Sequence, residues 1–197
     1  MSSLTVPADK RVIPYPSGWK VWRTDTRAIV GGVLLAVCFT ATMQITERID
    51  LAISGGIVPI LGPLFGIGWF VIAVFFYGLA AGLLTTWFNP IIAILTATGP
   101  LAPAWFGANG SVAVTFAALQ RYWLSRYKEV SFKQWFVACA ISWIPSSTVI
   151  AMVHILLLHF TWKSALGAWL VNYFASWPGI FIGWALARYI SKSGIAD

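Results

Sequence analysis

Seventy consecutive residues, from Leu51 to Gln120, carry no Asp, Glu, Lys or Arg. A second uncharged stretch of 19 residues lies between Arg27 and Glu47. A helix needs about 20 apolar residues to cross a hydrocarbon core of about 30 Å, so both stretches have room for membrane spans. Only 10% of the whole chain is charged, against about 25% in soluble domains. The sequence therefore predicts an all-α integral membrane protein.

The distribution of basic residues indicates which ends of the spans face the cytoplasm. Of the 13 Lys and Arg residues, 11 lie before the first span, between Arg121 and Lys133, or at the end of the last span. Such residues collect in cytoplasmic loops. We therefore expect both termini and the loop at 121–133 to be cytoplasmic, with no cleaved secretory signal. On this interpretation the net charge of +7 reflects topology, and nucleic acid is not an expected partner.

Six spans fit the length of the chain, because both ends lie on one side and the number of crossings must be even. The expected spans are 28–46, 51–66, 67–88, 105–123, 135–159 and 165–190. The second contains several glycines and prolines, so it could re-enter the membrane instead of crossing it.

The expected organisation is a cytoplasmic tail at 1–26, a six-helix membrane domain at 27–190 and a short cytoplasmic tail at 191–197. The first 22 residues are predicted to be irregular. Glu47, Arg48 and Asp50 are expected to form a short outer loop. Cys38 and Cys139 are both interpreted as small buried apolar residues, since each lies in an apolar span.

Small side chains recur at every fourth position of the first span, which places them on one face of a helix. This small-residue ladder consists of Ala28, Gly32, Ala36 and Thr40. Small residues allow close approach of another helix in lipid. The ladder is therefore a candidate docking face for a partner protein, or else packs against helices of the same chain.

Hydrogen-bonding and aromatic side chains gather toward the outer ends of five expected helices, where they form a candidate binding layer. Its members are Gln44, Glu47, Trp87, Asn89, Trp105, Asn109, His154, Trp169, Asn172, Tyr173 and Ser176. Polar groups at membrane depth usually face the bundle interior and indicate a binding site. Rings combined with amides suit a flat heterocycle. The alternative is that the Trp and Tyr residues belong to interfacial belts and that the polar groups are structural.

Enzymatic chemistry is poorly supported by the sequence. The chain has six acidic residues and two histidines, and no acid–base pair or metal cluster stands out. His154 and His159 lie about 140° apart on a helix, so they do not form a metal pair. The phosphate-binding sequence Gly-x-x-x-x-Gly-Lys-Ser/Thr is absent, so the chain cannot hydrolyse ATP by that motif. We expect no cofactor, no metal and no enzymatic activity.

Three features together resemble the substrate-binding S-components of energy-coupling factor (ECF) vitamin transporters. A basic segment, Trp22-Arg23-Thr24 followed by Thr26-Arg27-Ala28, leads into the first helix. The ladder resembles the Ala-x-x-x-Ala docking motif of these proteins, although Gly32 takes the place of the central alanine. Six helices in about 200 residues are joined by Gly/Pro-rich runs at 62–66 and 99–103. The Met-His start of nickel and cobalt members is absent, which argues against a metal substrate.

The resemblance implies a plasma-membrane protein that captures a vitamin or precursor at its outer face. The substrate would be capped by the loops after the first and third helices. The chain would dock through its first helix on a transmembrane coupling subunit that works with two ABC ATPases. The aromatic content favours a heteroaromatic substrate, such as a thiamine precursor or riboflavin. Two alternatives stay open: an accessory subunit of a larger membrane complex without its own ligand, and a membrane enzyme or passive channel.

Overall fold

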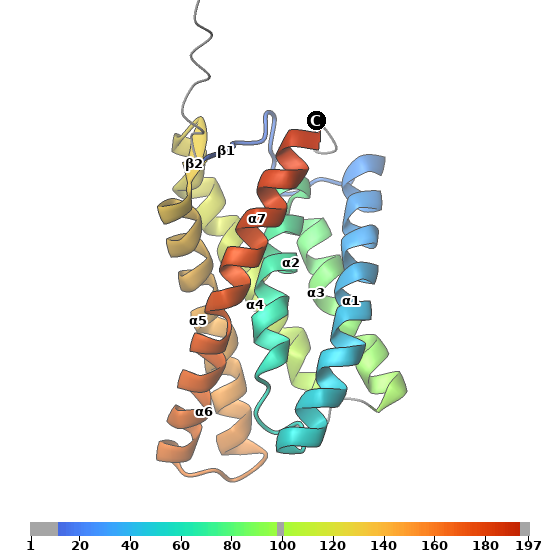
Figure 1. Cartoon of the computed structure of the whole chain (residues 1–197), viewed down its shortest axis with the longest axis vertical. Helices are drawn as coiled ribbons and strands as arrows, with labels where there is room; N and C mark the ends of the chain where they lie inside the picture. Colours follow the sequence, from blue (N-terminus) through green and yellow to red (C-terminus); the bar gives the residue numbers. More distant parts are fainter. Residues whose placement is uncertain (1–11, 98–100, 194–197) are drawn as a thin grey trace, which may run out of the picture.

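The computed structural model describes residues 12–97 and 101–193 as a bundle of helices with a small sheet at one end (Figure 1). The helices are α1 (Thr26–Ser54), α2 (Leu61–Tyr77), α3 (Leu79–Thr96), α4 (Ala102–Tyr122), α5 (Phe132–Leu156), α6 (Trp162–Ala175) and α7 (Trp177–Ser193). The strands are β1 (Val12–Pro14) and β2 (Glu129–Ser131), and a single 3-10 turn covers Leu124–Arg126. The predicted all-α class is confirmed.

Four stretches of the described chain are long and apolar enough to cross a membrane: α1, α3, α5 and the stretch 162–193 that α6 and α7 form together. The break between α6 and α7 falls at Ser176, just before Pro178. The central helix α2 is apolar but has only 17 residues, about 26 Å of helix. With α4, these elements make the six crossings of an integral membrane protein.

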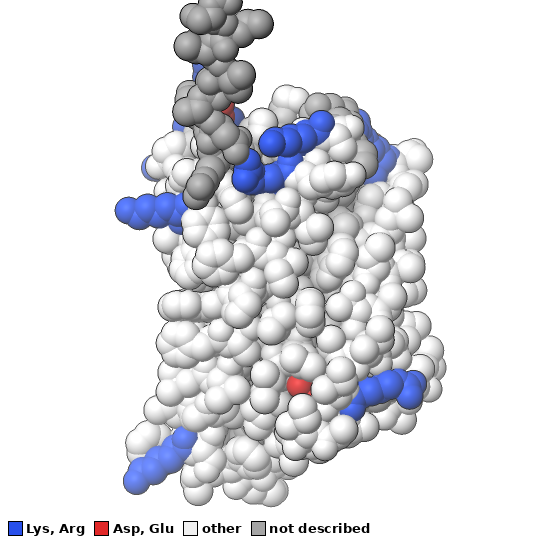
Figure 2. All heavy atoms as spheres, in the orientation of Figure 1, with Lys and Arg blue, Asp and Glu red and all other residues white. Residues whose placement is uncertain are grey.

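The two ends of the bundle differ in charge. Basic side chains cluster at the end where α1 begins and α7 ends, whereas the middle of the face shown in Figure 2 carries no charged side chain. Only Arg48 and Lys163 lie outside the three basic regions of the sequence. Because Lys and Arg are retained on the cytoplasmic side, we refer to the basic end as the cytoplasmic end and to the opposite end as the outer end.

Helix α2 is the centre of the bundle. It packs against α1, α3, α4, α6 and α7, and every residue from Gly66 to Tyr77 except Trp69 is buried. A helix that is apolar on all sides is stable only inside a protein or a membrane. The helices around α2 instead expose large apolar residues, such as Leu34 and Phe181, on the outside of the bundle.

Local signals explain where several helices begin. Asp25 caps α1 by accepting the Ala28 N–H at 3.1 Å. Ser131 and Gln134 form a reciprocal capping box at the start of α5, an arrangement that satisfies two backbone donors at once. Gly55 ends α1 with a φ of 65°, which glycine adopts without a steric penalty.

Part of the predicted irregular tail is ordered against the cytoplasmic end. Residues 12–14 pair antiparallel with 129–131, with Ile13 opposite Val130. The Trp19 indole donates to the Val74 carbonyl oxygen at 3.1 Å, and the Arg23 guanidinium donates to the Phe76 carbonyl oxygen at 3.1 Å. The prediction of irregular chain is therefore wrong for 12–14. The division into tails and a membrane domain stays a prediction, because it depends on where the bilayer lies.

The predicted boundaries of the second and third spans are wrong, although their order is right. The turn between them lies at Gly78, with a φ of 86°, and not near residue 66. The preceding segment covers this turn: the Leu79 N–H donates to the Val21 carbonyl oxygen at 2.8 Å. Asn89 and Pro90, expected at the end of a span, lie inside α3.

The expected outer loop at residues 47–50 does not exist, because α1 continues to Ser54. Glu47 and Asp50 are both buried in this helix. Cys139 is buried as predicted, but Cys38 is exposed on the outside of the bundle, so that part of the prediction is wrong. The connection that leaves α1 is therefore the segment 55–60, which we call the outer loop.

Candidate functional site

A cavity lies toward the outer end of the bundle, between α1 and the outer halves of α2 to α6. Its empty space is about 600 Å³ when open solvent at its mouth is counted, and the part in which the centre of a water molecule fits is about 50 Å³. The lining residues are Phe39, Met43, Glu47, Asp50, Gly56, Pro59, Gly62, Pro63, Phe70, Asn89, Trp105, Ala108, Asn109, Trp143, Ser146, Ile150 and Asn172. Most of this lining is apolar, with a few carboxylate, amide and hydroxyl groups, as is typical of small-molecule sites.

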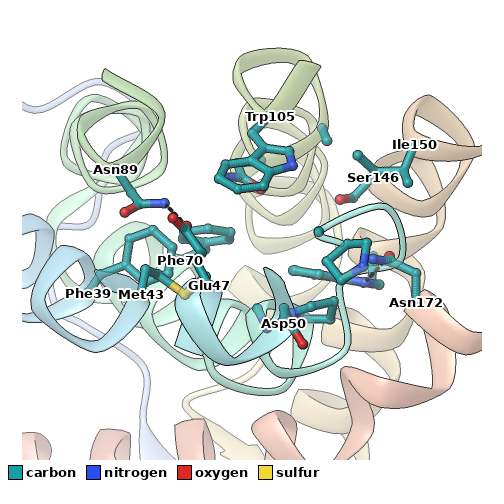
Figure 3. Close-up of a pocket in the computed structure, with 17 residues that line it drawn as sticks. Phe39, Met43, Glu47, Asp50, Phe70, Asn89, Trp105, Ser146, Ile150 and Asn172 are labelled. Carbon is teal, nitrogen blue, oxygen red and sulfur yellow. Dashed lines mark hydrogen bonds between the residues drawn. The ribbon is translucent and has the colours of Figure 1, made fainter. Parts of the chain in front are cut away.

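Four rings form the aromatic part of the lining. Phe39 meets Phe70 edge-on, with ring centroids 4.7 Å apart. Phe70 in turn stacks with Trp143 at 6.2 Å and an interplanar angle of 17°. Trp105 approaches from the opposite side of the cavity (Figure 3). Rings on facing walls favour a flat ligand, because offset stacking is a preferred arrangement of aromatic groups.

Glu47 and Asn89 join α1 to α3 beside the cavity. The Asn89 Nδ2 donates to Glu47 Oε1 at 2.6 Å, and both side chains are nearly inaccessible to solvent. The two residues point toward each other in Figure 3. A charge-assisted hydrogen bond of this kind is shorter and stronger than a neutral one. It therefore holds the Glu47 carboxylate in one orientation at the cavity wall.

Asp50 has a structural task at the other side of the cavity. Its carboxylate accepts the N–H groups of Ile60 and Leu61, at 3.2 and 3.0 Å, and that of Gly62 at 3.1 Å. These are donors at the first turn of α2, which lack partners within the helix. Asp50 therefore attaches the outer loop and the start of α2 to α1.

Asn172 supplies a second amide to the lining, from α6. Its Oδ1 accepts from the Trp143 indole at 3.1 Å and from the Ser147 hydroxyl at 2.9 Å. The Asn109 amide donates to the Thr86 carbonyl oxygen at 3.4 Å. The protein thus positions both amides before any ligand is present.

The outer loop covers one side of the cavity and is attached at its middle to α5. The His154 Nε2 lies 2.7 Å from the Ile57 carbonyl oxygen. A carbonyl oxygen only accepts, so this ring nitrogen carries the proton. The imidazole also stacks on Phe160 at a centroid distance of 5.0 Å. His154 therefore lies outside the lining and holds the loop that forms it.

Five of the eleven predicted site residues line the cavity: Glu47, Asn89, Trp105, Asn109 and Asn172. Whether they bind a substrate stays a prediction. The other six, which make contacts elsewhere, are Gln44, Trp87, His154, Trp169, Tyr173 and Ser176.

Each of those six side chains makes a hydrogen bond or a ring contact with another part of the protein, outside the cavity lining. Trp87 donates to the Phe106 carbonyl oxygen at 3.0 Å. Trp169 donates to Thr148 at 3.2 Å and stacks on Tyr173 at 5.0 Å. The Ser176 hydroxyl donates to the Tyr173 carbonyl oxygen at 2.7 Å. Gln44 Oε1 accepts from the Thr96 hydroxyl at 3.5 Å. Of the four predicted residues between Trp169 and Ser176, only Asn172 therefore lines the cavity.

Several lining residues were missed by sequence reasoning. Three of them, Phe39, Met43 and Asp50, lie at helical spacing on the same face of α1 as the predicted Glu47, and this periodic signal was available. Phe70 and Trp143 lie within long apolar runs, where no pattern separates them from core residues. Ser146 follows Pro145 in α5, where a hydroxyl is as readily explained by a bond to a backbone carbonyl as by a ligand.

The small-residue ladder faces the interior of the chain and not a partner. All four of its residues are buried, and α1 packs closely on α3. A Cβ added at Gly32 would lie 2.9 Å from the Ala81 Cα, and the Thr85 hydroxyl donates to the Gly32 carbonyl oxygen at 3.3 Å. Of the two alternatives stated for this face, the structure agrees with packing inside the chain, because α3 occupies it.

The described residues include no group of three His, Cys, Asp or Glu side chains that could hold a metal ion. What the cavity offers chemically is a set of aromatic faces, two carboxylates and neutral amides. Such a lining can bind and orient a small organic molecule.

The fold and the cavity together define a class: a small polytopic α-helical membrane protein with a cavity near one face. No family model matches the sequence, and a comparison with curated proteins finds no match. A solved structure described as an S-component of an ECF transporter aligns with a TM-score of 0.63 over 88% of this chain and 89% of its own. The sequence identity is 15%, so the similarity establishes that the chain has this fold.

Proposed function

We propose that this chain is the substrate-binding subunit of an ECF-type importer in the plasma membrane, and that its cavity captures a small heteroaromatic vitamin or vitamin precursor. The observation that carries the proposal is the position of the cavity. It combines aromatic rings with fixed amides and carboxylates at the outer end of a fold shared with an S-component. The outer loop that covers it would open to admit the substrate.

The energy for uptake would come from partners, namely a transmembrane coupling subunit and two ABC ATPases. The sequence carries no phosphate-binding motif of its own, so a coupled importer needs ATPases on other chains. The proposal keeps α1 as the helix that contacts the coupling subunit, but through a different face from the ladder. Because α3 covers the ladder, the contact would use the opposite face of α1, where Val33, Leu34 and Val37 are exposed.

Mild-detergent affinity purification from the native host tests the proposal, with mass spectrometry of the proteins and small molecules in the eluate. We expect a second membrane protein, two ABC ATPases and a retained heteroaromatic molecule. A different set of membrane partners without any small molecule would contradict the proposal and favour an accessory subunit.

A further inference from the structure

We infer that the cavity selects a planar ligand that carries a positive charge, and that it disfavours ligands carrying a carboxylate or phosphate. The inference rests on the proposed function, and it names the charge class of the substrate. Two carboxylates, Glu47 and Asp50, line the cavity. None of the described residues that line the cavity is lysine, arginine or histidine, and His154 lies behind the outer loop, outside the lining.

Charge of one sign inside a membrane protein has a strong effect on ligand choice, because the surroundings screen it poorly. A cationic ligand would be attracted to both carboxylates of the cavity. An anionic ligand would be repelled by the same groups and would lose its hydration without gaining a cationic partner. The remaining polar lining, Asn89, Asn109, Asn172 and Ser146, is neutral and cannot reverse this balance.

The helix N-terminus that Gly62 and Pro63 bring to the lining is already occupied. The N-terminus of a helix carries a partial positive charge and unpaired N–H donors, and the first turn of α2 reaches the cavity through Gly62 and Pro63. However, the N–H groups of Leu61 and Gly62 both donate to Asp50. A ligand carboxylate or phosphate would have to displace Asp50 to use them.

Glu47 is the carboxylate positioned to meet a ligand. Asp50 accepts three N–H groups at the start of α2, and Glu47 accepts from the amide of Asn89 at 2.6 Å. Figure 3 shows this pair below and to one side of Trp105. A flat cation placed between the rings would have Glu47 at its edge.

The rings of the cavity favour the same class of ligand. Phe70 and Trp143 stack nearly parallel, and Trp105 faces the space from α4. Aromatic faces attract cations through their quadrupole, most strongly when the cation is desolvated. The aromatic and acidic parts of the lining therefore act in the same direction.

The test uses the full chain, purified in mild detergent, with three pyridines of similar size as probes: cationic 1-methylnicotinamide, neutral nicotinamide and anionic nicotinate. Binding is followed by tryptophan fluorescence, and any molecule retained from the host is identified by mass spectrometry. We expect the cation to bind on the order of tenfold or more tightly than nicotinate. Glu47→Gln should remove most of this preference while preserving side-chain size.

The control variant is Glu129→Gln, which removes the same charge from an exposed position in β2, far from the cavity. It should leave the order of the three probes unchanged. Circular dichroism and thermal unfolding of Glu47→Gln establish that the variant folds.

The outcomes separate this inference from the proposed function. A retained ligand that carries a carboxylate or phosphate, or nicotinate binding as tightly as the cation, would overturn the inference and leave the transport proposal standing. If a retained molecule is present and no pyridine binds, a cationic retained molecule would support the inference and a neutral or anionic one would overturn it. Absence of any retained molecule, together with no binding by any probe, would overturn both.

Discussion

The carboxylate of Asp50 accepts the backbone N–H of Leu61 at 3.0 Å across a connection of ten residues. One side chain of α1 thereby fixes the start of the central helix α2 and one wall of the cavity. The arrangement is a helix cap supplied by another helix, and it satisfies donors that an apolar first turn cannot satisfy itself.

Asp50→Ala should therefore destabilise the fold and weaken ligand binding together. Loss of a capping acceptor costs about 0.5–2 kcal/mol, and the released outer loop would no longer hold its side of the cavity. Asp50→Asn retains one acceptor oxygen and should recover part of the loss. Thermal unfolding of the three proteins in detergent measures the effect. Equal stability of the alanine variant and the wild type would contradict the role of Asp50.

The contact between His154 and Ile57 predicts a change in dynamics. His154→Phe keeps a ring that can stack on Phe160, but removes the donor that lies 2.7 Å from the Ile57 carbonyl oxygen. We expect faster amide hydrogen exchange within 55–60 and faster release of a bound ligand, because the loop opens more often.

The control for this change is His159→Asn. His159 is exposed and has a φ of 54°, which asparagine tolerates. It should leave the exchange of the outer loop unchanged. Unaltered exchange in His154→Phe would show that the loop is held by other contacts.

The sequence alone predicted much of this fold, since uncharged length and the position of basic residues decide how often and in which direction a chain crosses a membrane. The turn at Gly78 was missed for a physical reason. The Phe76 carbonyl oxygen accepts from Arg23, and the Leu79 N–H donates to the Val21 carbonyl oxygen. Both partners are more than 50 residues away along the chain. The turn therefore needs no charged residue of its own, and nothing local distinguishes it from the surrounding span.

The site was only half predictable for a related reason. Glu47 and Asn89 are polar residues in apolar runs, so each indicated a buried site. Asp50 also lies in α1, but nearby Arg48 and the following glycines indicated a loop. Trp87 and Trp169 have the residue type expected of a ligand site, yet their indoles bond to Phe106 and Thr148. Residue type therefore indicated the layer, while packing decided which members face the cavity.

Close approach of α2 and α7 predicts a sharp effect at a glycine. A Cβ added at Gly179 would overlap the Leu64 carbonyl oxygen, which belongs to the helix backbone and cannot rotate away. Gly179→Ala should destabilise the protein by about 1–3 kcal/mol through overpacking. Gly167→Ala is the matched control: it makes the same change in α6, where a Cβ meets nothing within 4 Å. Thermal unfolding compares them, and equal stability of the two variants would contradict the tight α2–α7 contact.

The pair formed by Arg23 and Asp25 predicts a dependence on pH at the start of α1. The Arg23 guanidinium, 3.0 Å from the carboxylate, lowers the pKa of Asp25, and the bond from the Ala28 N–H lowers it further. The stabilisation is thus present above pH 3.8, the pKa of the free group, and is lost as the pH falls through the lowered value.

Asp25→Asn keeps the capping acceptor without the charge, and so isolates this effect. The variant should unfold at a slightly lower temperature than the wild type at pH 7. The difference should shrink toward zero as the wild-type carboxyl becomes protonated in acid. Thermal scans of both proteins between pH 7 and pH 3 measure it, and a difference that grows toward acid would have the wrong sign.

The burial of the small-residue ladder changes what a bulky substitution there should do. A side chain larger than glycine at Gly32 meets the backbone of Ala81, so Gly32→Leu should separate α1 from α3. This would lower stability by about 1–3 kcal/mol and disturb the Glu47–Asn89 bond between the same helices, weakening ligand binding. Leu34→Trp enlarges a side chain that is 60% exposed and should leave stability and ligand binding unchanged.

The two variants therefore distinguish the faces of α1 in a co-purification with the proposed coupling subunit. If the partner contacts the exposed face, Leu34→Trp reduces co-purification while ligand affinity stays at the wild-type level. Gly32→Leu reduces stability, ligand affinity and co-purification together, because its effect passes through the α1–α3 contact. A stable Gly32→Leu protein that binds ligand normally but loses only the partner would show that the ladder becomes available to the partner after all.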